Sequence, residues 1–277
     1  VAAEVTAPTQ DGLLTKEALP GGTVSYTFVA SHPGTFMYHS GSRPELQVEM
    51  GLLGALIVRP SLGAGYAYNH VDTRFDREYL FLLTEMDPSI HDLVEGGFSD
   101  QVDTTTYWPV YWFINGRAAP DTMLESNVPW LPNQPYNAMP RMHPGEKLLM
   151  RVIGSGHEGH PFHNHGNHAR TIARDGRLLE SFAGAGPDLG HPVFTIQANP
   201  DQTTDAIFEW TGKDLGWDVY GSAPHTCTPG PDGLDTVTKE YCADHGKAFP
   251  TILPDPLSVT FGSMWGGSPF LGALGSL

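Results

Sequence analysis

The sequence predicts an all-β protein composed of β-sandwich domains of the Greek-key type. Glycine and proline are frequent, with 32 and 24 residues in a chain of 277, which favours many turns and short strands. Strand-like runs of alternating or continuous apolar residues recur along the chain, each bounded by glycine or proline. Amphipathic helices with capping residues are scarce, and residues 88–97 (PSIHDLVEGG) are the best candidate for a helical turn.

The predicted strands follow one another along most of the chain. Residues 22–30 alternate apolar and polar side chains, as a half-buried strand does. Residues 34–40 follow a Pro-Gly turn, residues 54–60 are short and apolar and end at a proline, and residues 77–87 have an apolar centre long enough for a strand. Further strands are expected at 111–117, which ends in an Asn-Gly turn, 147–156, 168–179, which contains an Asp-Gly turn, 205–212 and 257–263.

A domain boundary is predicted in the Gly-rich segment 61–76, which gives a first domain at 1–72 and a second at 73–277. The first domain is incomplete at its N-terminus, because a β-sandwich of this kind needs on the order of 100 residues. Its missing strands are expected either upstream of Val1 or from a partner chain that adds a strand. The apolar tail 264–277 is expected to pack on another domain or subunit, so a homo-oligomer or an assembly partner is one expectation.

Charge and hydropathy exclude several classes of partner. The chain has 31 acidic and 15 basic residues and a formal net charge of −16, so it repels phosphate backbones and anionic membrane surfaces. No nucleic acid and no membrane span are expected, because the longest apolar run, residues 51–58, suits a buried strand. The chain starts without Met or a signal peptide, so a processed chain is expected.

Residues 159–168 (GHPFHNHGNH) place four of the 13 histidines, His160, His163, His165 and His168, in ten positions. In a strand, side chains two residues apart share a face, so His163 and His165 are expected to project together. Neutral imidazole suits copper. The segment therefore predicts a metal site, and the alternative is a strand whose histidines hydrogen-bond to backbone or solvent.

This segment resembles the H-P-x-H-x-H-G-x-H motif in the last cupredoxin domain of multicopper oxidases. Residues 34–60 resemble the G-T-F-W-Y-H-S-H segment of the first domain in that family, and residues 114–122 and 143–153 resemble flanking strands. The resemblance extends to about residue 212. It implies cupredoxin-like Greek-key domains, bound copper, and oxidation of a donor coupled to reduction of oxygen to water.

The resemblance also implies individual ligands. His163 and His165 match the two histidines that bind different coppers of a three-copper cluster, His160 matches a blue-copper ligand, and His39 matches the first histidine of the first-domain pair. The second histidine of that pair is Gly41 here, and the upstream H-x-H-G pair has no equivalent in this chain. The region 215–227 does not match the H-C-H segment that carries the blue-copper cysteine. These departures imply a reduced copper complement.

Cys227 and Cys242 are separated by a turn-rich segment, which predicts a disulfide and an oxidising compartment, extracellular, periplasmic or at the cell surface. Closing such a loop of about fifteen residues contributes roughly 3 kcal/mol in the chain-entropy model. Two alternatives stay open at this point. The runs HTC and CADH together offer a Cys₂His₂ zinc set, and YCADH echoes the C-x-x-H of small blue-copper proteins.

The predicted function is that of an exported copper-binding protein, similar to multicopper oxidases, with copper as the first expected metal and zinc as the second. Whether it is an oxidoreductase, and on which donor, does not follow from the sequence. The alternative is a non-catalytic cupredoxin-like structural or assembly subunit of an extracellular or cell-surface complex.

Overall fold

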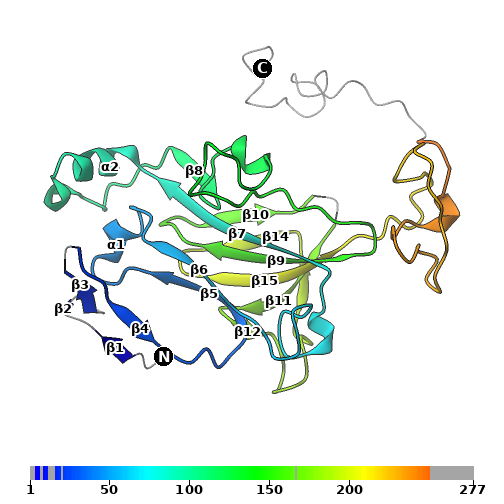
Figure 1. Ribbon diagram of the computed structural model, residues 1–277, viewed down its shortest axis with the longest axis horizontal. Coiled ribbons are helices and arrows are strands. Elements are labelled where there is room, and N and C mark those ends of the chain that lie inside the picture. Colours follow the sequence, from blue (N-terminus) through cyan, green and yellow to red (C-terminus); the bar gives the residue numbers. More distant parts are fainter. Residues whose placement is uncertain (1–3, 7–8, 12–15, 20, 166, 250–277) are drawn as a thin grey trace, which may run out of the picture. The chain divides into compact units, whose positions relative to one another are not determined.

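The computed structural model describes residues 4–6, 9–11, 16–19, 21–165 and 167–249. It confirms the all-β class, with many short strands and few helical turns. Figure 1 shows the strands and helices along the chain, and contacts between residues divide the chain into two units. Unit 1 comprises Val1–Met142 and Lys147–Glu209, and unit 2 comprises His143–Glu146 and Trp210–Leu277. All of the strands in the described part of the chain belong to unit 1.

The main element of unit 1 is a seven-stranded sheet in which most neighbouring strands are distant in sequence. Its strands pair in antiparallel fashion, except that β7 and β9 are parallel. The strand order is β12 (Arg177–Leu178), β11 (Ala169–Arg174), β15 (Thr203–Glu209), β9 (Lys147–Gly154), β7 (Arg77–Met86) and β8 (Tyr111–Ile114), with β13 (His191–Val193) also paired to β11.

Strand β9 shows why this sheet lies in the middle of unit 1. Almost all of its side chains are buried, as in a strand that is covered on both faces. Leu148 and Met150 belong to one apolar core, together with Ile196 of β14 (Thr195–Ala198). Leu149 belongs to a second core, on the opposite face of the sheet. The short sheet formed by β10 (His160–His163) and β14 therefore packs on the first face.

The hairpin of β5 (Gly34–His39) and β6 (Leu53–Val58) is attached to the second face by a buried polar network. The Thr35 hydroxyl donates to Asp205 at 2.5 Å and accepts from Arg151 at 2.7 Å. The Arg151 guanidinium lies 3.4 Å from the Asp205 carboxylate. Because buried charges are tolerated only when they are paired and hydrogen-bonded, this network fixes the hairpin in one position on the sheet.

The remaining elements of unit 1 are small. Two further hairpins pair β1 (Glu4–Thr6) with β4 (Ser25–Thr27) and β2 (Thr9–Asp11) with β3 (Lys16–Ala18). The helices are α1 (Pro44–Gln47), α2 (Pro88–Glu95), and the 3₁₀ turns η1 (Val71–Thr73), η2 (Ser99–Gln101) and η3 (Asp121–Met123). None of the helices in the described residues is long and apolar enough to cross a membrane.

Several predicted elements are confirmed, and one is much shorter than expected. The Asn-Gly and Asp-Gly turns form at Asn115 and Asp175, where both residues of each turn have positive φ. The predicted helical turn is α2, whose N-cap is Asp87. The strand expected at 22–30 shrinks to β4, because its side chains remain exposed and only three residues pair. The expected strand 257–263 and the tail 264–277 lie outside the described residues.

The predicted domain boundary at residue 72 remains a prediction. In the structure, β5 and β6, which precede it, and β7, which follows it, all fall in unit 1. The described part of unit 2 consists of loops and the 3₁₀ turn η4 (Cys242–Asp244). A disulfide joins Cys227 and Cys242, whose Cα atoms are 5.5 Å apart, as the sequence predicted.

Candidate metal sites

The four predicted ligand histidines occupy three separate places in unit 1. His160 begins β10 and faces β7, His163 ends β10 and lies against His165, and His39 ends β5. Among the described residues, no group of three or more potential metal ligands within 4.8 Å of one another includes any of these four. The histidine-rich segment therefore does not gather its histidines into a single site.

His160 is bound to a buried carboxylate. Its Nε2 lies 2.7 Å from Oε2 of Glu85 on β7, a residue that is 4 % exposed. Glu85 also accepts hydrogen bonds from the backbone N–H groups of His157 and Glu158. Burial by itself raises the pKa of Glu85, but the hydrogen bonds from His160 and from the two backbone N–H groups outweigh it and leave that pKa below its ordinary value. The Nε2 atom of His160 is thus engaged by a carboxylate.

A second buried carboxylate, Glu49, lies close to Glu85, and the two share a contact with Tyr107. The Tyr107 hydroxyl donates to Glu49 at 2.8 Å and lies 3.4 Å from Glu85. The Nε2 atoms of His91 and His157 lie 3.4 and 4.0 Å from Glu49 and have no hydrogen-bond partner. Burial and the adjacent Glu49 raise the pKa of the Tyr107 phenol, so it stays a donor to these carboxylates.

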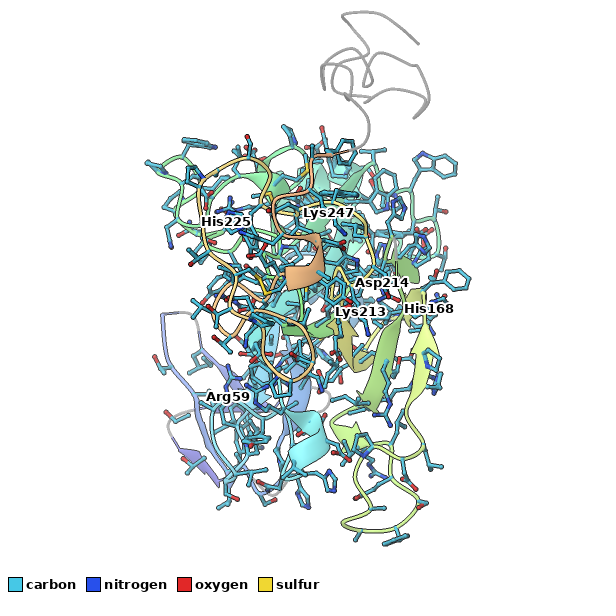
Figure 2. The ribbon with its side chains drawn as sticks, turned by 90° about the vertical axis from the view of Figure 1, so that its right-hand side faces the viewer. Arg59, His168, Lys213, Asp214, His225 and Lys247 are labelled. Atoms are coloured by element: carbon cyan, nitrogen blue, oxygen red, sulfur yellow. A yellow bond between two sulfur atoms is a disulfide. The ribbon has the colours of Figure 1, made fainter. Side chains whose placement is uncertain are left out.

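His163 and His165 are brought together. Their ring centroids are 5.0 Å apart with an interplanar angle of 70°, and both side chains are exposed. His163 Nδ1 lies 2.9 Å from the hydroxyl of Thr195 on the paired strand β14. When Nδ1–H donates to that hydroxyl, the lone pair of Nε2 remains available for a metal. His168, at the far end of the segment (Figure 2), contacts Phe194, the same ring that His163 contacts.

His39 lies apart from both groups. Its Nδ1 lies 2.8 Å from the backbone carbonyl of Ser40, and its Nε2 is 3.8 Å from the Asp201 carboxylate. The side chain lines a shallow pocket whose other polar residues include Asp175 and Asp201. This position offers a metal one imidazole and exposed carboxylates, and among the described residues that line the pocket there is no second histidine.

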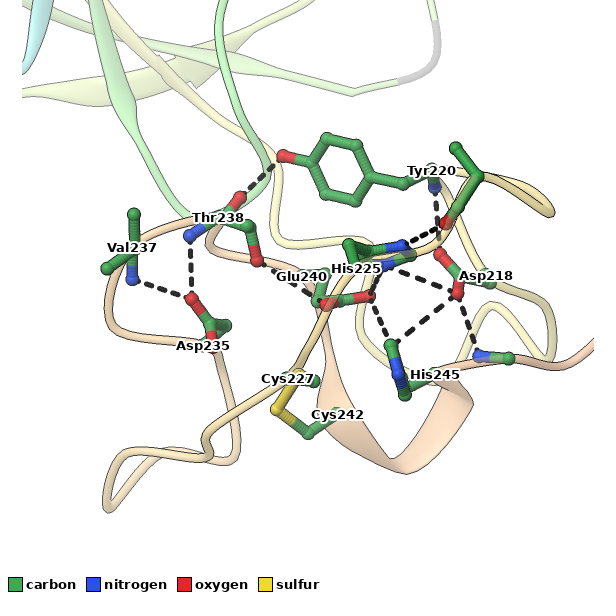
Figure 3. A network of polar contacts seen from close by, with 12 residues as sticks. Asp218, Tyr220, His225, Cys227, Asp235, Val237, Thr238, Glu240, Cys242 and His245 are labelled. Atoms are coloured by element: carbon green, nitrogen blue, oxygen red, sulfur yellow. Dashed lines mark hydrogen bonds and ion pairs between the residues drawn. A yellow bond between two sulfur atoms is a disulfide. The ribbon is translucent and has the colours of Figure 1, made fainter.

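Unit 2 contains a group of ligand-type side chains that does converge (Figure 3). Asp218, His225, Glu240 and His245 each direct one nitrogen or oxygen inward, and these four atoms lie within 4.8 Å of one another. The carboxylates of Asp218 and Glu240 are buried, with residue exposures of 3 % and 1 %. We call these four residues the unit 2 cluster.

Backbone contacts and the disulfide hold the unit 2 cluster. Asp218 accepts hydrogen bonds from the backbone N–H groups of Tyr220 at 2.9 Å and Gly246 at 2.7 Å. Cys227 follows His225 by two residues and Cys242 follows Glu240 by two residues, so the disulfide joins the two segments that carry these ligands. His245 follows directly after η4.

Electrostatics in the cluster favour the charged form of Asp218. Burial by itself raises the pKa of Asp218, but the backbone hydrogen bonds from Gly246 and Tyr220 and the two nearby histidines outweigh it and lower that pKa. The pKa of His225 is raised, first by its hydrogen bond to the Ala223 carbonyl and then by its contact with Glu240. That carbonyl lies 2.6 Å from Nδ1, which turns Nε2 toward the carboxylates.

The sequence reasoning identified only part of this cluster. His225 and His245 were considered as zinc ligands together with the cysteines, but the disulfide leaves no thiolate for a Cys₂His₂ set or for a blue-copper site. Asp218 and Glu240 were missed, because acidic residues are frequent in this chain. One signal could have identified Glu240: it precedes Cys242 by two residues, as His225 precedes Cys227.

No family model matches the sequence, and no curated protein is similar to it. Several solved structures are similar to this chain at low identity. A blue copper oxidase from Nitrosomonas europaea has 21% sequence identity and a TM-score of 0.49. The matched region covers 68% of this chain and 50% of the oxidase chain. A copper nitrite reductase from the same organism has 16% identity and a TM-score of 0.46, covering 75% and 64%. A laccase from Botrytis aclada has 19% identity and a TM-score of 0.43, covering 68% and 31%.

The chain spans about half the length of the first of these proteins and less than a third of the laccase. Multicopper oxidases, the family that residues 159–168 resemble in sequence, are thus among the structural neighbours. The neighbours as a group are multicopper oxidases, laccases and copper nitrite reductases.

Proposed function

We propose that this chain is an exported copper-binding protein and that His163 and His165 are its accessible copper ligands. The observation that carries this proposal is the contact between two exposed imidazole rings at the end of β10. Imidazole nitrogen is a favoured ligand of copper. The hydrogen bond to Thr195 orients the His163 ring, as the partners of metal-binding histidines generally do.

The geometry supports a smaller copper complement than a complete multicopper oxidase requires. His160 is bound to Glu85, and His39 lies at the end of a different strand pair. Two imidazoles fill part of a copper coordination sphere and leave positions for water, a donor molecule or a ligand from another chain. Bound copper would supply one-electron redox chemistry, and oxidoreductase activity on an external donor is part of this proposal.

Export is supported by the disulfide in unit 2. Structural disulfides persist in oxidising compartments and are rare in the cytosol. Cys227 and Cys242 form such a bond, and no free cysteine is present in the chain. An extracellular, periplasmic or cell-surface location is therefore proposed.

Copper titration of the full chain, followed by calorimetry and EPR, tests this function. Because unit 2 also presents two histidines, the titration uses the background His225→Ala/His245→Ala. We expect one Cu²⁺ per chain, with nitrogen superhyperfine structure, and loss of binding when His163→Ala and His165→Ala are added. His168→Ala is the matched control, since His168 contacts the same Phe194 ring and its loss should leave copper binding unchanged. Unchanged copper binding in the His163→Ala/His165→Ala protein would refute the proposal.

A second candidate function is that of a non-catalytic assembly subunit, and the edge of the main sheet supports it. β8 is the last strand in the sheet order and has an unpaired edge in the described structure. Trp108 is 77 % exposed, and Tyr111 and Trp112 are about half exposed. Exposed aromatic side chains beside an open strand edge are typical of surfaces that bind another chain.

Mass measurement by light scattering separates the two functions. An assembly subunit would associate in a concentration-dependent manner, and Trp108→Ser/Trp112→Ser would return it to the monomer. A wild-type chain that binds copper as expected and stays monomeric at high concentration would exclude the assembly function.

A further inference from the structure

We propose that Asp218, His225, Glu240 and His245 form a zinc site in unit 2, separate from the copper ligands proposed on β10. This inference does not depend on the proposed function, because the two sites share no residue. It assigns a role to two histidines and two buried carboxylates that the copper site does not use.

The nitrogen–oxygen distances among the four ligand atoms are compatible with one zinc ion between them. Oε2 of Glu240 lies 3.1 Å from His225 Nε2 and 3.3 Å from His245 Nδ1. Oδ2 of Asp218 lies 3.5 Å from the same His225 nitrogen and 3.6 Å from the same His245 nitrogen. A regular tetrahedron with metal–ligand bonds of about 2.05 Å has six edges of about 3.3 Å, and these four nitrogen–oxygen distances are close to that value.

The two carboxylates of the unit 2 cluster also favour binding of a cation. Asp218 and Glu240 are two buried carboxylates, and within the described residues of unit 2 their ion pairs are with His225 and His245 alone. In the metal-free chain, protonated imidazoles can compensate these carboxylates, whereas neutral imidazoles leave them without a compensating charge in a largely buried position, which is costly. One divalent cation neutralises the two carboxylates and leaves the imidazoles in the neutral form that binds metals.

The surrounding contacts preorganise the ligands. The Ala223 carbonyl lies 2.6 Å from His225 Nδ1, which fixes the tautomer that presents the Nε2 lone pair to the cluster. The rings of His225 and His245 are 4.6 Å apart and nearly perpendicular, at 86°. The second oxygen of Asp218 accepts the Tyr220 backbone N–H at 2.9 Å, so the carboxylate cannot rotate freely. Side-chain exposures of 19 % for His225 and 33 % for His245 leave an entry path for the ion.

The ligand set selects among metals. Two imidazoles and two carboxylates suit borderline cations such as Zn²⁺, whereas Ca²⁺ and Mg²⁺ prefer oxygen ligands throughout. Four protein ligands without an open position are typical of structural zinc sites. Zinc is therefore expected to stabilise unit 2, whose described residues contain no strand, rather than to perform catalysis.

The test uses the full chain with its disulfide intact, stripped of metal with EDTA and titrated with ZnCl₂ alone. We expect one Zn²⁺ per chain, with an X-ray absorption spectrum that shows nitrogen and oxygen ligands and no sulfur. His245→Ala, and separately the near-isosteric Glu240→Gln, are expected to weaken zinc binding more than about 100-fold, since loss of a supporting group alone costs 10–100-fold.

Two controls separate this site from the copper ligands and from misfolding. His163→Ala/His165→Ala should keep full zinc binding, and Glu240→Gln should keep the near-ultraviolet circular dichroism of the metal-free wild type. Zinc binding that persists in both unit 2 variants, a stoichiometry below a tenth of an ion per chain, or sulfur in the zinc coordination sphere would overturn the proposal.

Discussion

The histidine-rich strand segment 159–168 and the disulfide-bonded segment 218–245 use histidine in opposite ways. The first carries four histidines in ten residues, and they lie in different environments. His160 contacts the Glu85 carboxylate, whereas His163 contacts the ring of His165. The second contains two histidines in twenty-eight residues and brings both to one point, together with two carboxylates. The density of ligand-type residues in sequence is therefore a poor guide to where they converge.

Strand geometry explains the difference. In a strand, successive side chains point to opposite faces, so His160 is directed inward with Phe162 while His163 points outward. A strand can place two histidines side by side, but additional ligands must come from other elements. In unit 2, loops approach one another from several directions, and a covalent bond between Cys227 and Cys242 keeps them together.

The largest expected effect concerns the buried end of the histidine strand. Glu85→Ala removes the acceptor for His160 and for two backbone N–H groups, which leaves buried polar groups unpaired. We expect the free energy of unfolding to fall by about 3–5 kcal/mol, the usual cost of breaking a buried pair. Urea unfolding measures this change. The exposed His165→Ala should stay within about 0.5 kcal/mol of wild type, and an equally stable Glu85→Ala protein would show that the contacts of Glu85 do not stabilise the fold.

The next effect separates the two regions. Cys227→Ser/Cys242→Ser opens a loop with a sequence separation of 15 residues, and unit 2 should lose about 3 kcal/mol of stability. Zinc affinity should fall with it, because the segments that carry His225 and Glu240 are no longer joined. Calorimetry with and without ZnCl₂ gives both quantities. Copper binding at His163 and His165 should be unchanged, and a parallel loss of copper would mean that the two regions are coupled.

A smaller effect is expected for the residue that orients the copper ligands. Thr195→Val removes the hydroxyl next to His163 Nδ1 while nearly preserving the side-chain volume. Copper affinity should decrease by about 10-fold, at the lower end of the range for supporting groups of metal-binding histidines. Competitive titration against a copper chelator measures it. Gln197→Ala on the same strand is the matched control, and an equal decrease in that variant would argue against the specific role of Thr195.

The most gradual effect is that of acid. The pKa of Glu85 is lowered in the folded chain, so its contribution to stability is fully present above the unfolded-state pKa of about 4.3 and is lost as the pH falls through the folded-state value. The free energy of unfolding should therefore be flat with respect to Glu85 above about pH 5 and should decline below pH 4.3. Glu85→Gln, followed over the same pH range by urea unfolding, should show a shallower decline. Identical slopes in the two proteins would assign the acid sensitivity to other carboxylates.

Local features were predictable from sequence where one short segment contains all the information. The Asn115 and Asp175 turns formed as expected, because the residue types at the turn dictate positive φ. The helical turn at Pro88–Glu95 also formed, with the preceding Asp87 as its cap. The disulfide followed from two cysteines flanking a turn-rich loop. By contrast, β4 shows that alternation alone does not make a long strand when no layer covers its side chains.

What the sequence determined by itself was the all-β class, the turns, the disulfide and the proximity of His163 to His165, since each depends on residues close together in the chain. The tertiary structure decided the strand order, the pairing of His160 with Glu85, 75 residues earlier, and the meeting of Asp218 with Glu240 and the two histidines. These contacts join residues whose separation in sequence carries no periodic signal, because only packing and charge compensation in the folded chain select them.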